Sequence, residues 1–369
     1  MGSQQKGHLD PSLRRDYIVD VVLSPIPAMK RKALVLLSGG LDSILAVRVL
    51  LDQGIPVTGI RFITHFGCDP VSSGSCGHDV EPLVKAWGPL GFTVRMSHLG
   101  QDYIDMVKSP KFGRGKNMNP CVDCRLMMLS WAKEILEREG AGFLVTGEVL
   151  NQRPMSQTRE RFRQVDRLLG LEGMVLRPLS ARVLEPTRPE IEGVVDRSRL
   201  LDISGRGRTR QYELARKYGI TDIPQPSGGC LLTDPGYSAR LRDLWDHDPK
   251  AGSHDLNLLR VGRHFRPDGR CKIIVGRDET ENGMLEAFRL EGDALVYLKD
   301  HHGPMTLLRG EYGAGEIALA ASLTVRYGDV PDKGEAEVVI DRKGGVPYCL
   351  TSSGAREEEY APLRIAVPH

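Results

Sequence analysis

Short apolar segments alternate with amphipathic segments through the first part of the chain. Four apolar runs, at residues 32–37, 56–63, 93–99 and 143–146, have the length of buried strands. Residues 41–51, 80–90 and 122–138 instead repeat apolar side chains every three or four positions, which indicates helices, the second of them broken by Pro and Gly. This alternation predicts a parallel, doubly wound α/β sheet, whose ligands bind beyond the carboxyl ends of the strands.

The pattern changes near residue 250. The segment Leu-Arg-Pro-Leu at 176–179 and a helix at 210–218 continue the first domain, whereas residues 247–256 are polar and contain Pro and Gly, as a linker does. Beyond them we expect short strands at 271–275, 294–298, 306–308 and 336–340 and one helix at 315–325. We therefore divide the chain into an N-terminal extension (1–30), an α/β domain (31–247) and a smaller α+β domain (257–369).

Composition sets broad limits on this picture. The 369 residues suffice for two domains, and 40% hydrophobic with 27% charged residues is typical of a folded globular protein. A net charge of +2 by itself demands no polyanionic partner. No apolar run approaches the roughly 18 residues of a membrane span, and the first residues lack the apolar region of a signal peptide. Seven cysteines are too few for a disulfide scaffold, so we expect a cytoplasmic protein with reduced thiols.

The first candidate site is the hexapeptide that joins the first strand to the first helix. Its two glycines let successive backbone N–H groups converge on an anion at the helix N-terminus, and its serines add hydroxyl donors. A carboxylate beside phosphate is unfavourable unless it acts through a metal ion or positions a nucleophile. The alternative is a tight turn with Ser and Asp as helix caps. The candidate residues are Ser38, Gly39, Gly40, Leu41, Asp42 and Ser43.

Three cysteines form the second candidate site. Cys121 and Cys124 make a C-x-x-C at the start of the long helix, where the helix dipole favours negative charge, and Cys230 follows two glycines about a hundred residues later. Three thiolates suit a [4Fe–4S] cluster with one open iron, or a nucleophile with a disulfide partner. A structural zinc would require a fourth ligand. Buried structural cysteines are the alternative, and the remaining four cysteines, among them Cys68 and Cys76, have no such context.

The loop after the fourth strand is the third candidate site. It should face the same crevice as the hexapeptide, because the carboxyl ends of parallel strands share one edge of a sheet. Gly147 permits close approach of a ligand or backbone, while Glu148 and Gln152, with Ser156 and Gln157, offer polar groups to a nucleotide or a base. The alternative is a polar surface loop.

Taken together, these motifs resemble those of the PP-loop ATP pyrophosphatases, and within them the tRNA thiouridine synthases. Ser38-Gly-Gly-Leu-Asp-Ser43 is similar to the PP-loop itself. The T-G-E…Q…S-Q-T segment that begins at Thr146 resembles the 4-thiouridine synthase branch, and N-P-C-V-D-C, ending at Cys124, resembles the 2-thiouridylase branch. The resemblance covers residues 31–245. We identify no THUMP-like or rhodanese-like domain beside this segment.

The resemblance implies an ATP-dependent tRNA uridine sulfurtransferase. ATP would bind the hexapeptide with Mg²⁺ near Asp42, and the adenine would lie near Ile60 and Phe62. Cys124 and Cys230 would be catalytic. In cluster-dependent members the residues matching Cys121, Cys124 and Cys230 hold a [4Fe–4S] cluster, and we expect this cluster as a cofactor here. The sulfur donor would be sulfide or a persulfide carrier.

The second domain has a resemblance of its own. Residues 271–282 and 292–304 resemble the NFACT-R module, which implies RNA binding and an association with the ribosome. Basic side chains precede and enter this domain at Arg260, Arg263, Arg266, Arg270, Lys272 and Arg277, and others cluster in the first domain at Arg153, Arg159, Arg161, Arg163, Arg167, Arg206, Arg208 and Arg210. Such clusters suit phosphate contacts, although a solvated surface explains them too. Two other functions stay open: a PP-loop ligase or amidotransferase for a small molecule, and an ATP-sensing RNA-binding protein of ribosome quality control.

Overall fold

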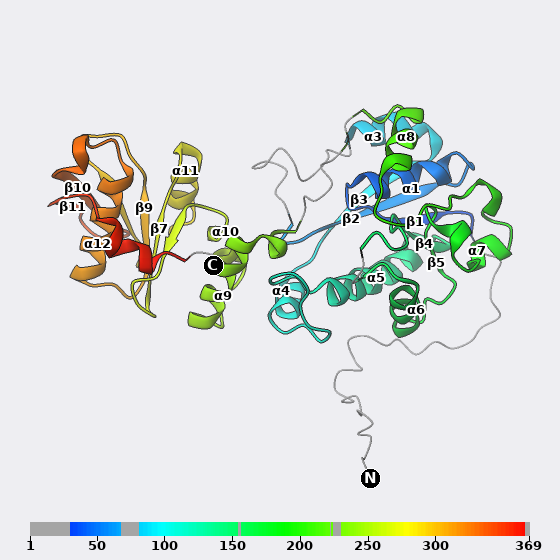
Figure 1. The fold of residues 1–369 in the computed structure, drawn as a ribbon, viewed down its shortest axis with the longest axis horizontal. Coiled ribbons are helices and arrows are strands. Elements are labelled where there is room, and N and C mark those ends of the chain that lie inside the picture. Colours follow the sequence, from blue (N-terminus) through cyan, green and yellow to red (C-terminus); the bar gives the residue numbers. More distant parts are fainter. Residues whose placement is uncertain (1–29, 68–80, 154–155, 222, 224–229, 366–369) are drawn as a thin grey trace, which may run out of the picture. The chain divides into compact units, whose positions relative to one another are not determined.

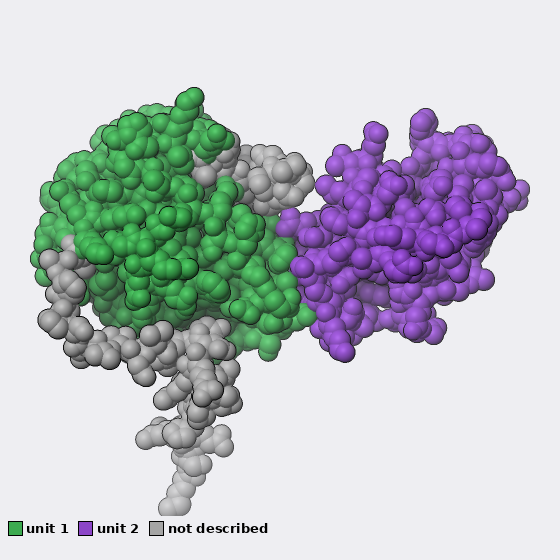
Figure 2. Space-filling view, turned by 180° about the vertical axis from the view of Figure 1, so that it is seen from behind, with its two compact units in different colours: residues 1–113, 120–229 green, residues 114–119, 230–369 purple. Residues whose placement is uncertain are grey.

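The computed structural model describes residues 30–67, 81–153, 156–221, 223 and 230–365. The chain forms two compact units: the first lies within residues 1–113 and 120–229, and the second comprises residues 114–119 together with residues from 230 on. Figure 2 colours the first unit green and the second purple. Among the described residues, no helix combines the length and the apolar character that a membrane crossing requires.

The first unit contains a five-stranded sheet in the order β3-β2-β1-β4-β5, and every neighbouring pair is parallel. The predicted doubly wound α/β fold is therefore confirmed. The strand order reverses between β1 and β4, which pair from Ala33 opposite Phe143 to Leu36 opposite Thr146. Ligands of such sheets bind at this reversal point. The strands are β1 Ala33–Leu36, β2 Val57–Ile63, β3 Phe92–His98, β4 Phe143–Thr146 and β5 Val175–Leu176.

Helices cover both faces of this sheet (Figure 1). Side chains alternate between the faces along β1, so Ala33 and Val35 pack in the core with α1 and α8, whereas Leu34 packs with α5 and α6. The helix predicted at 80–90 is α3 followed by a short 3-10 turn, because Gly and Pro end it. The helices are α1 Leu41–Leu51, α3 Glu81–Trp87, α4 Gln101–Lys108, α5 Cys121–Arg138, α6 Arg159–Leu168, α7 Arg188–Ile191 and α8 Thr209–Lys217.

The second unit contains a six-stranded antiparallel sheet in the order β11-β10-β8-β9-β7-β6. Apolar side chains of α12, such as Ala320 and Leu323, pack in one core with this sheet, and Leu285 of α11 packs in another. The strands are β6 Arg263–Phe265, β7 Cys271–Val275, β8 Ala294–Leu298, β9 Thr306–Gly310, β10 Ala336–Arg342 and β11 Tyr348–Ser352. The helices are α9 Pro235–His247, α10 Ser253–Leu258, α11 Glu279–Ala287, α12 Ala314–Tyr327 and α13 Glu357–Tyr360.

The segment interpreted as a linker, residues 247–256, contains helical structure. Helix α9 reaches His247, and α10 begins at Ser253 and buries Leu256 and Leu258 in the second unit. The second unit thus takes in residues from Cys230 on, earlier than the expected domain start at residue 257. The polar residues between the helices had suggested an open connection because their few apolar positions are widely spaced.

Candidate active site

The hexapeptide forms the turn between β1 and α1. Gly39 adopts a left-handed backbone with φ of 78°, which glycine accepts at no steric cost. The Ser38 Oγ accepts a hydrogen bond from the Gly40 N–H at 3.3 Å and lies 3.2 Å from the Ser43 Oγ. The Ser43 hydroxyl in turn donates to the Gly40 carbonyl at 2.8 Å. The two serines therefore fix the loop at the N-terminus of α1, where the helix dipole favours an anion.

Gly147 brings the loop after β4 directly against this turn. A Cβ on Gly147 would lie 2.5 Å from both the Cα and the backbone N of Ser43, a distance that no real side chain tolerates. The two loops follow neighbouring strands at the reversal point of the sheet. The sequence predicts that both loops lie at the same edge of the sheet, and the close approach of Gly147 to Ser43 agrees with this prediction.

Asp42 joins three segments that are distant in the sequence. Its Oδ2 accepts a hydrogen bond from the Gln152 Nε2 at 3.2 Å and lies 3.0 Å from the Arg208 Nη2. Its Oδ1 is buried and has no hydrogen-bond partner among the described residues. Gln152 was expected at this site, whereas Arg208 had been noted only as a member of an arginine cluster suited to phosphate contacts. One carboxylate oxygen is therefore occupied by Gln152 and Arg208, and the other remains for a ligand.

Glu148 contributes to an ion network rather than facing the hexapeptide alone. It pairs with Arg125 and Arg177 and accepts a hydrogen bond from the Thr146 hydroxyl at 3.0 Å. Burial by itself would raise the pKa of Glu148, but the two guanidinium groups outweigh it, and the pKa lies below its usual value. The expectation that Glu148 binds a nucleotide stays a prediction, and any such contact must share the carboxylate with two arginines.

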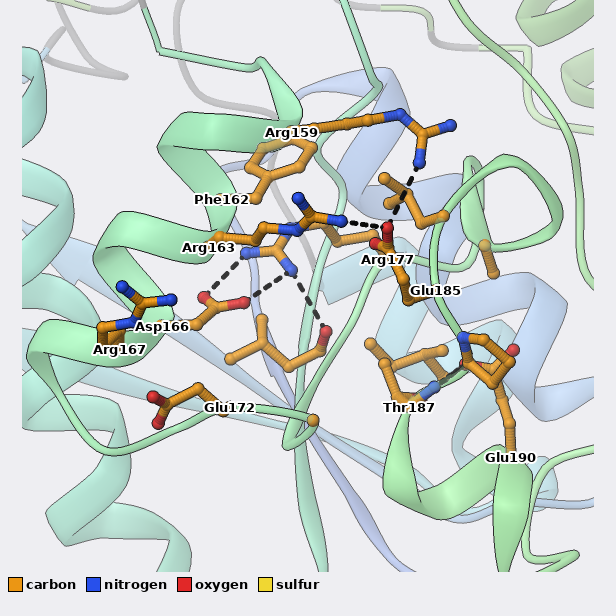
Figure 3. A pocket seen from close by; sticks show the side chains of 16 residues that line it. Arg159, Phe162, Arg163, Asp166, Arg167, Glu172, Arg177, Glu185, Thr187 and Glu190 are labelled. Atoms are coloured by element: carbon orange, nitrogen blue, oxygen red, sulfur yellow. Dashed lines mark hydrogen bonds and ion pairs between the residues drawn. The ribbon is translucent and has the colours of Figure 1, made fainter.

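The same network continues to the edge of the sheet. Arg177, 5% exposed, forms a bidentate pair with Asp166 at 2.9 and 3.0 Å, and the Phe162 ring lies 4.1 Å from its guanidinium. Burial raises the pKa of Asp166 despite this pair. Figure 3 shows Asp166 and Arg177 on the wall of a cavity of about 190 Å³, which is also lined by arginines of α6. Two arginines of α6, Arg159 and Arg163, pair instead with the exposed Glu185.

The C-x-x-C motif occupies the first turn of α5, as predicted. The Sγ of Cys124 lies 3.1 Å from the hydroxyl of Tyr103, which is 3% exposed. Between the cysteines, Asp123 accepts hydrogen bonds from the backbone N–H groups of Lys111 and Phe112 at 2.9 and 3.1 Å. The thiol-bearing turn is therefore anchored to the segment that precedes the helix.

Cys230 belongs to the second unit. Its carbonyl accepts hydrogen bonds from the N–H and hydroxyl of Thr233 at 2.9 and 2.7 Å. Two further bonds tie this region to residues 114–119: the Asn117 Nδ2 donates to the Thr233 carbonyl at 2.8 Å, and the Met118 N–H to the Leu232 carbonyl at 3.1 Å.

Cys121, Cys124 and Cys230 are the expected ligands of a [4Fe–4S] cluster. No disulfide joins the five described cysteines. Within the described residues, no three His, Cys, Asp or Glu side chains gather as a metal site. The proposed gathering of Cys121, Cys124 and Cys230 stays a prediction.

The remaining expected residues fall in different places. Ile60 is 1% exposed and packs in the core that α5 covers, so its side chain is not on the surface of the crevice, while Phe62 is half-buried beside the same core. Cys68, Cys76 and the two glycines before Cys230 lie outside the described residues. Arg125 and Arg208 were missed as site residues, because their roles depend on tertiary contacts.

Two family models match parts of the chain. Residues 28–183 match the family model described as thiamine biosynthesis protein (ThiI), and residues 262–362 match the model described as NFACT protein RNA binding domain. The first match includes the hexapeptide, the C-x-x-C and the loop after β4. The second match begins just before β6.

Individual relatives carry tRNA-modification names. The chain is 30% identical over 118 residues to the tRNA-specific 2-thiouridylase MnmA of Syntrophotalea carbinolica, covering 31% of this chain and 33% of that protein. It is 23% identical over 266 residues to the protein of that name from Listeria monocytogenes, covering 67% and 68%. It is 30% identical over 148 residues to a probable tRNA sulfurtransferase of Lysinibacillus sphaericus, covering 40% and 34%. The chain thus spans from about one third to about two thirds of the length of these relatives, and it is similar to a ThiI family model over residues 28–183 and to an NFACT RNA-binding model over residues 262–362.

Proposed function

We propose that the protein is an ATP-dependent tRNA sulfurtransferase, which activates a uracil carbonyl as an adenylate and replaces its oxygen with sulfur. The observation that carries the proposal is the contact of Gly147 with Ser43, which joins the hexapeptide to the loop after β4 at the reversal point of the sheet. Asp42, Gln152 and Arg208 meet at the same place. The names of the relatives support tRNA as the substrate class.

The first step is adenylation. The triphosphate lies at the N-terminus of α1, where backbone N–H groups and the hydroxyls of Ser38 and Ser43 offset its charge. A carbonyl oxygen of the target uracil attacks the α-phosphorus, and pyrophosphate leaves. The buried, unpartnered Oδ1 of Asp42 fits a hard cation, and a bound Mg²⁺ would neutralise phosphate charge there. The contribution of the chain is therefore positioning and electrostatic stabilisation.

The second step transfers sulfur through thiols. Cys230 accepts a sulfane sulfur from the donor as a persulfide, whose terminal sulfur attacks the adenylated carbon; the C–O bond breaks and AMP leaves with its electron pair. The Cys124 thiolate then attacks the Cys230 Sγ, the S–S bond breaks, and thiouridine is released as a Cys124–Cys230 disulfide forms. An external dithiol reduces this disulfide before the next turnover.

The segment after Cys230 is hydrogen-bonded to residues 117 and 118. Residues 117 and 118 are bonded to residues 233 and 232, so the segment that leads into Cys121 and the segment that follows Cys230 are held together within the second unit. Cys121 follows Met118 by three residues and Cys230 precedes Leu232 by two.

A [4Fe–4S] cluster is the other form of the sulfur step. The described residues form no three-ligand group, so we derive no step through a cluster. Iron analysis of protein purified without oxygen distinguishes the two forms: about four irons per chain would indicate a cluster with three cysteine ligands. Thiol chemistry predicts full activity without iron and a Cys124–Cys230 disulfide after one turnover.

We propose that the second domain binds the tRNA substrate, since it matches an RNA-binding family model. In this thiol form of the sulfur step the donor is a persulfide carrier, whereas sulfide would serve only the cluster form; the expected location is the cytoplasm. A second function is favoured by the same match: an ATP-sensing RNA-binding protein associated with the ribosome. In that case Cys124→Ala would leave the function intact, whereas thiolation requires this thiol.

Thionucleoside analysis of tRNA from a strain that lacks the gene tests the proposal. One thiouridine should disappear, return with the wild-type gene, and stay absent with Cys230→Ala. Cys349→Ala is the matched control, because Cys349 is an exposed cysteine on β11. Unchanged thionucleosides in the deletion strain would contradict the proposed function.

A further inference from the structure

We propose that Arg208 is the counter-charge that allows the hexapeptide to accept a triphosphate beside Asp42. The inference rests on the proposed function, because it concerns ATP at this loop. Arg208 lies 166 residues after Asp42 in the chain, yet its Nη2 is 3.0 Å from the Asp42 Oδ2. The side chains are 21% and 14% exposed, so water screens their interaction only in part.

In the first turn of α1, the negative charge of Asp42 would repel the phosphates of ATP. Asp42 follows the two glycines of the loop, and its carboxylate therefore lies where the phosphates of ATP would bind. Like charges a few ångströms apart in a partly buried site disfavour one another strongly. The guanidinium of Arg208 carries a positive charge that offsets the negative charge of the Asp42 carboxylate.

The surrounding structure holds Arg208 in place. It is the residue before α8, and Ala215 of that helix is buried in the core that contains α1. The preceding residues are bonded to the loop after β4, since the Leu150 carbonyl accepts the Gly205 N–H at 2.8 Å and the Ser204 hydroxyl at 3.2 Å. The guanidinium is thus fixed by the same loop that carries Gly147 and Gln152.

The neighbouring arginines have other positions. Arg210 pairs with Asp202, and Arg206 is exposed. Of these three arginines, Arg208 is the one whose guanidinium contacts the hexapeptide. Gln152 shares the same carboxylate oxygen, so the pair also fixes the orientation of Asp42 and leaves Oδ1 for a ligand. Arg208 therefore acts through Asp42 as a positioning residue.

A charge-balance experiment tests this role without a catalytic readout. ATP binding is titrated by calorimetry in EDTA, so that no metal contributes. Arg208→Met leaves the Asp42 charge uncompensated and should weaken metal-free ATP binding by about tenfold or more. The double variant Asp42→Asn with Arg208→Met removes both charges and should restore affinity to within about threefold of the wild type, a coupling that a double-mutant cycle isolates.

Two further variants complete the design. Asp42→Asn alone leaves Arg208 uncompensated beside the phosphates and should tighten metal-free binding by about threefold or more, which also tests the role if Arg208→Met does not fold. Arg216→Met is the matched control, because Arg216 is an exposed arginine on the same helix and its loss changes the net charge equally. It should bind ATP within about twofold of the wild type.

The outcomes separate the inference from the proposed function. A double variant as weak as Arg208→Met would show that Arg208 contacts phosphate directly and would overturn the counter-charge role. Wild-type affinity in Arg208→Met, or weaker binding in Asp42→Asn, would also overturn it. Absence of ATP binding by the wild-type protein in both EDTA and Mg²⁺ would instead contradict the proposed function, and the inference with it.

Discussion

Each unit contains a buried ion network, and the two networks differ in their balance of charge. In the first unit, Arg125 and Arg177 face Glu148 and Asp166, so two cations meet two carboxylates. In the second unit, Asp243 pairs with Arg266 at 2.7 Å and with Lys272 at 3.2 Å, so two cations share one carboxylate.

The difference in balance appears in the pKa values. In the first unit the two arginines hold the pKa of Glu148 below its usual value in spite of burial. In the second unit burial lowers the pKa of Lys272 to about 8, because Asp243 is shared with Arg266 and cannot offset it. His264 is 2% exposed and lies close to the same cations. Burial disfavours its charged form, so the pKa of His264 lies well below its usual value. Opposite charges therefore outweigh the effect of burial on the pKa at Glu148, but not at Asp166 or Lys272.

Both networks hold a segment that adjoins a candidate cysteine. Arg125 follows Cys124 and ties α5 to the loop after β4. Asp243 lies on α9, which begins five residues after Cys230, and ties that helix to β7 through Lys272. The comparison therefore predicts that substitution costs more in the first network than in the second, and that the second network responds to alkaline pH through Lys272.

The largest effect is expected for Glu148→Gln. The substitution removes a carboxylate that Arg125 and Arg177 share, and breaking a buried pair from one side costs about 3–5 kcal/mol. The melting transition of the first unit should fall in differential scanning calorimetry, while that of the second unit stays. Glu172→Gln, at an exposed glutamate of the first unit, is the control. Equal melting temperatures of the first unit in Glu148→Gln and Glu172→Gln would show that the buried ion network does not stabilise this unit.

The next effect concerns pH. The folded-state pKa of Lys272, about 8, lies below the roughly 10.4 of an unfolded lysine. Between these values the unfolded chain binds a proton that the folded unit does not, so stability of the second unit should rise with pH, by about 3 kcal/mol in total. Below pH 8 both states are protonated and this contribution is constant. Denaturation of Lys272→Met over the same range should show no such rise, and an unchanged rise would refute the assignment.

Asp243→Asn should lower the free energy of unfolding of the second unit by less than Glu148→Gln lowers that of the first. It leaves Arg266 and Lys272 without a carboxylate, but Lys272 can release its proton whereas an arginine cannot. We expect a loss of about 2–3 kcal/mol at pH 7, measured from the melting transition of the second unit. The loss should shrink as the pH approaches 9. A loss that stays constant with pH would argue against a titrating Lys272.

The smallest effect is expected for Phe162→Leu. The Phe162 ring lies 4.9 Å from the Arg125 guanidinium and 4.1 Å from that of Arg177, so it covers both cations of the first network. Loss of the aromatic face should cost about 1 kcal/mol beyond the change in packing. The same substitution in a Glu148→Gln background measures this coupling. Additive effects would show that the ring serves packing alone.

The sequence predicted the fold better than the site. Strands at 143–146, 271–275 and 294–298 coincide with β4, β7 and β8, because long apolar runs in a buried sheet leave few other registers. Strand β6, with three residues, and β11, with mostly exposed residues, offered no such pattern. Periodicity reports burial, and short or exposed elements bury too little to be visible in it.

Within the site, backbone constraints were more predictable than ion pairs. The approach of Gly147 to the hexapeptide follows from strand order and from the chemistry of glycine. Arg206, Arg208 and Arg210 look alike in the sequence, and only the packing of α8 with α1 selects Arg208. Glu148 was expected at the nucleotide for its position after β4, but the sequence holds no sign that Arg125 and Arg177 converge on it.

A single-turnover reaction with purified protein tests the central claim most directly. The protein is mixed with unmodified tRNA, ATP, a sulfur donor and a dithiol, and AMP and thiouridine are measured from the same samples. Thiolation by adenylation predicts that both products form in equal amounts, and that Cys230→Ala forms no thiouridine. Consumption of ATP with no thiouridine from either sulfide or a persulfide donor would contradict the account.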